Sequence, residues 1–164
     1  MALRRRARSG GQSLVEFALV LPLFLLLFFA IVDMGRAVFV YNSVTNAARE
    51  GARLAIVNQD TTSITNRAKQ QVAIAETANP SVTVNFYETN DDGTADTSSP
   101  CPTTAYFGCV AVVSFQTTFR PITPIIGNIV FKNGVTLTAT SSLAVEYDCP
   151  NTQYPTAAQC PKQP

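Results

Sequence analysis

The sequence has no histidine and no tryptophan among its 164 residues. Histidine is the side chain that general acid–base catalysis most often recruits, and it is the commonest metal ligand. Its absence therefore disfavours hydrolytic and metal-dependent enzymes. We do not expect the chain to be an enzyme, and we predict neither a cofactor nor a metal ion for it.

Positive charge is scarce outside the first residues of the chain. Four arginines lie within residues 1–11, whereas residues 12–164 hold eight basic and eleven acidic residues, a net charge of −3. A mildly acidic body without a basic stripe lacks the kind of surface that nucleic acids bind. Nucleic acid is therefore not an expected partner.

Charge of either sign is scarcest between Leu14 and Val32, where Glu16 is the one charged residue among nineteen. An α-helix of that length rises about 28 Å, close to the ~30 Å hydrocarbon core of a bilayer. The run predicts one transmembrane helix, and Pro22 inside it should bend that helix. By the positive-inside rule, the preceding arginines place the N-terminus in the cytoplasm and the rest of the chain outside.

Two ordinary explanations of this run are weaker. A secretory signal peptide has an apolar region of about 7–15 residues and a small-x-small cleavage site, whereas Ala30 is followed here by Ile31, Val32 and Asp33. An uncleaved signal anchor explains the arginines and the length but not Glu16. A carboxylate well inside a bilayer costs on the order of 2.5–3.5 kcal/mol, so Glu16 is expected to have a compensating partner.

The residues around the start of the run carry a family resemblance. Gly11 is followed by Gln-Ser-Leu-Val-Glu, which places Glu16 five residues after a glycine, with basic residues before and an apolar helix after. This arrangement resembles the processing site of type IV prepilins. The resemblance implies that a prepilin peptidase removes the basic leader, residues 1–11, and that Gln12 becomes the new N-terminus. It also implies that Glu16 is a docking charge for the new amino group of a neighbouring subunit.

Residues 10–57 resemble more narrowly the TadE/TadG-like pseudopilins of tight-adherence (Flp) pilus systems. The matching pieces are 16–18, Pro22, 33–36 and the sequence AAREGAR at 47–53. The resemblance implies a minor pilin or pseudopilin of the cytoplasmic (inner) membrane that acts in pilus assembly and surface attachment. Its partners would be other pilins and inner-membrane assembly proteins. The alternatives are a pseudopilin of a related type II secretion or DNA-uptake machine, or a membrane-anchored extracytoplasmic binding protein.

Small residues recur at every fourth position beyond the span, at Ala47, Gly51 and Ala55. Such a stripe lets another element approach a helix closely. We interpret it as a face that packs on the protein's own sheet, and a packing face for neighbouring pseudopilins is the alternative.

Charged residues of the same helix, which is expected to cover 12–57, are given simpler roles. We expect Arg49, Glu50 and Arg53 to lie mostly on a solvated face. Asp33 and Arg36 are expected to fix the depth of the helix at the outer membrane boundary, with contact to another subunit as the alternative.

Residues 58–164 are predicted to form an extracytoplasmic α+β domain. Helical composition covers 63–78, and alternating apolar residues indicate strands near 82–86, at 110–119 and at 135–147. Asn133-Gly134 is a turn signal, and Thr123-Pro124 favours the start of a short helix. The predicted fold is a long N-terminal helix packed on a small antiparallel sheet, which is also the layout of type IV pilin-like proteins.

Cys101, Cys109, Cys149 and Cys160 all lie on the predicted outer side of the membrane, where disulfides persist. Four cysteines allow three pairings. Proximity in the sequence favours Cys101–Cys109 and Cys149–Cys160, and their spacing is wider than that of a typical zinc site.

The stretch ETNDDG, residues 88–93, has oxygen-bearing side chains at Glu88, Asn90 and Asp92, followed by Gly93. It is similar to the first half of a calcium loop, but Ser99 stands where the loop requires a bidentate glutamate. We therefore interpret the stretch as an Asp-Gly loop tip, with calcium binding as the alternative.

Overall fold

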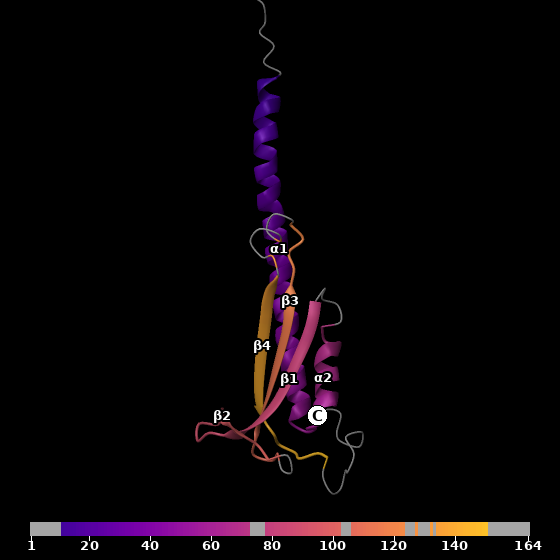
Figure 1. The fold of residues 1–164 in the computed structure, drawn as a ribbon, viewed down its shortest axis with the longest axis vertical. Coiled ribbons are helices and arrows are strands. Elements are labelled where there is room, and N and C mark those ends of the chain that lie inside the picture. The colour runs from indigo at the N-terminus through magenta and orange to yellow at the C-terminus, as the bar shows by residue number, and fades with distance from the viewer. Residues whose placement is uncertain are drawn as a thin grey trace, which may run out of the picture.

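A computed structural model describes residues 11–72, 78–102, 106–123, 127, 132 and 134–150. Within these residues, two α-helices and four strands follow one another: α1 (Gln12–Ala55), α2 (Thr61–Gln70), β1 (Ala78–Thr89), β2 (Ala95–Pro100), β3 (Val110–Phe119) and β4 (Val135–Ala144). The strands form one antiparallel sheet in the order β2-β1-β3-β4. The predicted α+β arrangement, a long N-terminal helix on a small antiparallel sheet, is confirmed (Figure 1).

α1 has 44 residues, so it rises about 66 Å, more than twice the hydrocarbon thickness of a bilayer. Its N-terminal half protrudes from the domain, and its C-terminal half lies along the sheet (Figure 1). α1 packs against β3 and β4, while α2 packs against α1 and β1. One face of the sheet is therefore covered by helices.

β3 supplies the middle of the core. Side chains at alternate positions are buried, at Ala111, Val113, Phe115, Thr117 and Phe119. Successive residues of a strand point to opposite faces of the sheet, so this alternation fixes which face meets the helices. The other face carries polar side chains such as Gln116, Thr138 and Thr140, which are exposed, as the sequence predicted for a half-buried sheet.

α2 is shorter than predicted. Asp60 caps its N-terminus by accepting a hydrogen bond from the backbone N–H of Ser63 at 2.8 Å. The helix ends at Gln70, not at Ala78, which already pairs with Thr118 in the sheet. The predicted helix 63–78 is therefore wrong at its C-terminal end. Residue 78 belongs to strand β1 and pairs with β3, although the composition of 63–78 favours a helix.

Two other boundaries differ from the sequence-based expectation. β2 was not predicted, since ADTSSP shows no apolar alternation, and it pairs on one side only, with β1. β4 ends at Ala144, before the predicted limit of 147. There the chain leaves the sheet, because the N–H groups of Glu146 and Tyr147 both bond to the carbonyl of Ile56 at 3.1 Å. The predicted short helix after Thr123 and residue 133 of the predicted turn lie outside the described residues.

Gln59 fastens the end of α1 to the segment after β4. Its side-chain amide donates to the carbonyl oxygens of Ala55 and Tyr147, each at 2.9 Å. Its side-chain oxygen accepts from the backbone N–H of Cys149 at 2.6 Å. Gln59 is buried, so these bonds satisfy polar atoms that water does not reach.

Candidate functional site

The predicted processing and docking residues lie together at the start of α1. Gly11 directly precedes the helix, and a Cβ built on it meets no atom within 4 Å. Gln12 begins the helix, and its side-chain amide donates a hydrogen bond to Oε1 of Glu16 at 3.2 Å. All three residues are exposed. The Glu16 carboxylate is therefore exposed on the surface of the helix.

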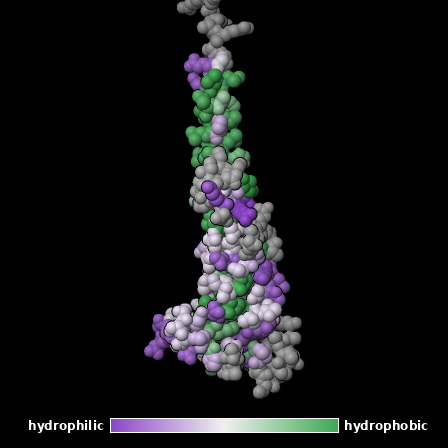
Figure 2. Space-filling model, viewed as in Figure 1, coloured by the Kyte–Doolittle hydropathy of each residue, from purple (hydrophilic) through white to green (hydrophobic). Residues whose placement is uncertain are grey.

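The protruding half of α1 is apolar on all sides. No residue from Leu14 to Val32 is buried, and the helix is long and apolar enough to cross a membrane. Figure 2 shows this half as a green hydrophobic column that rises from a mostly hydrophilic domain. α1 continues as an α-helix through Pro22. A helix that is apolar all round needs an apolar environment, and this finding agrees with a membrane-anchored protein.

The small-residue stripe faces the interior of the domain. Ala47, Gly51 and Ala55 are all buried. A Cβ added at Gly51 would lie 3.0 Å from Cγ1 of Val113 in β3 and 3.3 Å from Cβ of Ala68 in α2. Three elements therefore meet where glycine leaves room, and the structure places the stripe in the chain's own core, not on a surface open to neighbours.

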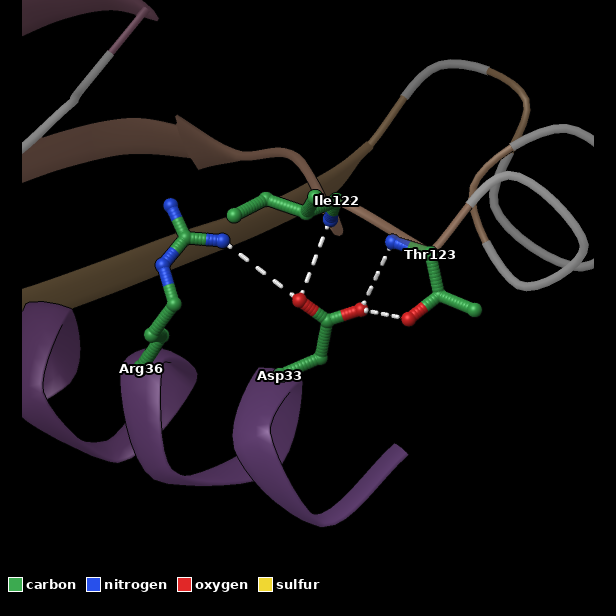
Figure 3. A network of polar contacts seen from close by, with 4 residues as sticks. All are labelled: Asp33, Arg36, Ile122 and Thr123. Atoms are coloured by element: carbon green, nitrogen blue, oxygen red, sulfur yellow. Dashed lines mark hydrogen bonds and ion pairs between the residues drawn. The ribbon is translucent and has the colours of Figure 1, made fainter. Parts of the chain in front are cut away.

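A polar cluster joins α1 to the segment that follows β3 (Figure 3). Oδ1 of Asp33 accepts a hydrogen bond from the backbone N–H of Ile122 at 3.0 Å. Oδ2 accepts from the backbone N–H of Thr123 at 3.0 Å and from its hydroxyl at 2.5 Å. Asp33 is only 6% exposed, so one buried carboxylate holds two consecutive residues of a segment about ninety positions away.

Arg36 completes this cluster. Its guanidinium lies 3.4 Å from Oδ1 of Asp33 and 5.6 Å from the ring centre of Phe119, close enough for a cation–π contact. Burial on its own would raise the pKa of Asp33, but hydrogen bonds from Thr123 and Ile122, together with the charge of Arg36, hold that pKa below its usual value. The carboxylate is therefore the stable form at neutral pH.

The sequence-based role of Asp33 and Arg36, to fix depth at the membrane boundary, is incomplete. Both residues also hold the outer domain against the helix. An acidic residue at the end of an apolar run signals a boundary, but its spacing in the sequence gives no indication of Thr123 as a partner. The hydroxyl and the Thr-Pro pair suggested a helix start at that position instead.

Glu50 is also more than a solvated-face charge, which corrects the expectation. Oε1 of Glu50 accepts from Nη2 of Arg67 at 2.6 Å and from Nε at 3.1 Å. The pair connects α1 to α2, and the Glu50 side chain is 16% exposed. Arg53, at 3.7 Å from the same carboxylate, is 70% exposed and so remains on the solvated face as predicted, as does Arg49.

The described cysteines, Cys101, Cys109 and Cys149, lie at the end of the domain opposite the protruding helix. Cys101, just after β2, forms a disulfide with Cys109, just before β3. Cys149 is buried and disulfide-bonded, and its predicted partner Cys160 lies outside the described residues. The Cys101–Cys109 bridge therefore closes the connection between β2 and β3 and is remote from the predicted docking residues.

Residues 88–93 cover the end of β1, which closes at Thr89, and most of the loop that leads to β2 at Ala95. Asp92 is used within the loop, because Oδ1 accepts hydrogen bonds from the backbone N–H of Thr94 at 2.9 Å and from its hydroxyl at 2.6 Å. Gly93 has a positive φ of 82°, which glycine adopts without strain. In the described part of the chain, no group of three or more acidic, cysteine or histidine side chains is placed to hold a metal ion. These contacts are those of a loop tip.

The N-terminal part of the chain is similar to a known family. Residues 11–53 match the model of a family described as TadE-like protein. This segment of the chain is TadE-like. The match confirms the resemblance seen in the sequence and supports a role associated with the tight-adherence pilus. The TadE-like segment begins at the glycine of the predicted processing site and covers α1 almost to its end. Neither a curated protein nor a solved structure matches the chain.

Proposed function

We propose that the chain is a minor pilin or pseudopilin of a tight-adherence pilus, anchored in the cytoplasmic membrane by residues 14–32. The basic leader stays in the cytoplasm, and the domain that carries the sheet faces outward. A prepilin peptidase cuts after Gly11. The protein performs no chemistry of its own; it is a peptidase substrate and then a subunit that assists pilus assembly and surface attachment.

One observation carries this proposal: within the TadE-like segment, residues 14–32 form a bare apolar helix whose one carboxylate, Glu16, is exposed on its side. In the bilayer this carboxylate is costly unless it meets a cation. Cleavage after Gly11 creates such a cation, the α-amino group of Gln12. Within one chain the Glu16 carboxylate already accepts a bond from the side chain of Gln12, and the amino group of a neighbouring subunit would supply the missing charge.

Mass spectrometry of the protein extracted from membranes tests the cleavage. We expect Gln12 as the N-terminal residue, and we expect Gly11→Ala to block or slow the cut. A Cβ at residue 11 meets no atom of the chain within 4 Å, so this variant leaves α1 intact and a loss of cleavage reports recognition by the peptidase. Intact Met1 or Ala2 in cells that contain the peptidase would contradict the proposal, and so would a cut beyond Ala30.

Substitution of Glu16 tests the docking charge. Glu16→Gln should spare membrane insertion, because a neutral amide costs less to bury than a carboxylate. It should reduce the co-purification of processed subunits with pilus components and reduce surface pili. Glu16→Asp is the matched control, because it keeps the charge and should retain more assembly than Glu16→Gln. Normal assembly in the Glu16→Gln strain would show that the carboxylate is not the docking charge.

A further inference from the structure

A groove of about 720 Å³ lies where α1 leaves the domain. One wall is α1, and the other is formed by the membrane-proximal ends of β3 and β4. Its lining includes Ala30, Ile31, Met34, Phe119, Pro121 and Val135. The volume falls within the range of about 300–1,000 Å³ that is usual for pockets holding small ligands.

The chemistry of the lining selects an apolar occupant. Among the described lining residues, Asp33 is the one charged side chain. Its two carboxylate oxygens already accept hydrogen bonds from Ile122 and Thr123. A ligand with several polar groups would lose its hydration without finding partners in the groove, which is unfavourable. A hydrocarbon chain has no such cost.

The position of the groove identifies the source of that hydrocarbon. Ala30 and Ile31 belong to the apolar run 14–32, so the groove is continuous with the surface that faces the lipid. The apolar surface does not stop at the end of the run, because Met34 is 70% exposed and Ile122, across from α1 in the segment after β3, is 68% exposed. The mouth of the groove therefore lies at the depth where acyl chains end and headgroups begin.

Basic side chains occur at the same end of the domain. Arg36 lies over the ring of Phe119, which lines the groove, and its side chain is 28% exposed. Arg120, directly after Phe119 in the chain, is exposed. Cations at this depth suit the phosphates of phospholipid headgroups.

We propose that the groove holds one acyl chain of a phospholipid from the leaflet next to the sheet-bearing domain, so that the base of the domain is seated in the membrane surface. This inference rests on the membrane insertion of α1 proposed above, but not on cleavage after Gly11 or on a pilus role. The lipid fills the space between α1 and the strand ends and thereby sets the angle at which the domain meets the membrane.

The absence of tryptophan from the sequence permits a direct test. Single tryptophans are introduced into the full chain, reconstituted as one copy per nanodisc with phosphatidylcholine brominated in the middle of its acyl chains, since bromine quenches tryptophan emission at short range. Val135→Trp places the probe in the groove. Thr136→Trp, the next residue of β4 and on the exposed face, is the matched control at the same depth. Phe24→Trp, in the apolar run, reports insertion.

We expect Phe24→Trp and Val135→Trp to lose most of their emission in brominated lipid and Thr136→Trp to keep its own. Gly35→Leu in the Val135→Trp background should restore emission by filling the groove, because a Cβ at Gly35, which lines the groove, meets no atom within 4 Å. Equal emission from Val135→Trp and Thr136→Trp would overturn the inference, and so would quenching that Gly35→Leu leaves intact.

The same experiment separates this inference from the proposed function. If Phe24→Trp is quenched and Val135→Trp is not, α1 is inserted and the groove alone is misassigned. If Phe24→Trp is not quenched, insertion itself is refuted, and the acyl-chain site is refuted with it. Emission of Val135→Trp that changes when two copies share one nanodisc, and not with bromination, would assign the groove to the helix of a second copy and would also overturn the inference.

Discussion

Removal of the Asp33 carboxylate should detach the segment that follows β3 from α1. In Asp33→Ala, the backbone N–H groups of Ile122 and Thr123 and the hydroxyl of Thr123 lose their acceptor at once. Hydrogen bonds to a charged group contribute about 1.5–3 kcal/mol each, and a buried donor left without a partner costs about 1–3 kcal/mol. Because the three bonds share one carboxylate they are not additive, so we expect a loss of about 3–5 kcal/mol.

A loss of this size is large beside the 5–15 kcal/mol by which domains are usually stable. It is measured by urea unfolding of the full chain in detergent, followed by the emission of its five tyrosines, since no tryptophan masks them. Amide hydrogen exchange gives the local effect: protection at Ile122 and Thr123 should fall much more than protection at the centre of β3. Asp91→Ala, at an exposed aspartate of the β1–β2 loop, is the control and should change stability by no more than about 0.5 kcal/mol.

Acid should reproduce this effect in the unmodified chain. The native pKa of Asp33 is held below its usual value. The carboxylate therefore contributes its full stabilisation above the pKa of the unfolded state, about 3.9, and this contribution is lost as the pH falls through the native pKa. The stability difference between the unmodified chain and Asp33→Asn should shrink as the pH is lowered from 6 to 3. A difference that is independent of pH, or an Asp33→Ala cost below about 1 kcal/mol, would refute the assigned role of the cluster.

Three further predictions concern the packing of the domain. Gly51→Val should destabilise the domain by about 1–3 kcal/mol in urea unfolding, because even its Cβ would lie 3.0 Å from a side chain of β3; Gly35→Ala, where the space is open, should not. Arg67→Gln should lower the free energy of unfolding by about 1–2 kcal/mol, and Arg53→Gln by less than about 0.5 kcal/mol. Both arginines pair with Glu50, but the pair with Arg67 is shorter and far less exposed. Equal losses in the two variants would contradict this expectation. Cys101→Ser should lower the free energy of unfolding by about 2.5 kcal/mol, because it removes the disulfide to Cys109 and releases a loop with a sequence separation of 8. Non-reducing peptide mapping of the unmodified chain should recover the Cys101–Cys109 bridge.

The elements with strong periodicity were predictable from the sequence. The apolar run at 14–32 and the helical pattern after it gave α1, and the alternation at 110–119 gave β3 and its buried face. In each case the same hydrophobic pattern extends over many residues, so local propensity and the pattern of burial indicate the same secondary structure. The disulfide between Cys101 and Cys109 was favoured by proximity alone.

The elements that escaped prediction depend on partners distant in the sequence. β2 exists because β1 offers it a free edge, and its own residues show no strand pattern. α2 stops at Gln70 because the chain must reach its pairing position opposite β3. The bonds from Asp33 to Thr123 and from Glu50 to Arg67 are set by how the helices lie on the sheet. No local pattern encodes such pairs, so the sequence indicated charged residues without their roles.

The orientation of α1 decides which variants can report on assembly. The small residues Ala47, Gly51 and Ala55 are the most suggestive helix–helix stripe in the sequence, yet they are buried against the sheet and α2. A bulky substitution there disturbs the core, and a loss of pili in such a strain would report misfolding. The outward face of the C-terminal half of α1 carries Val38 and Phe39, which are 54% and 57% exposed. Together with Glu16, that face is where a substitution can alter contacts between subunits while leaving the domain folded.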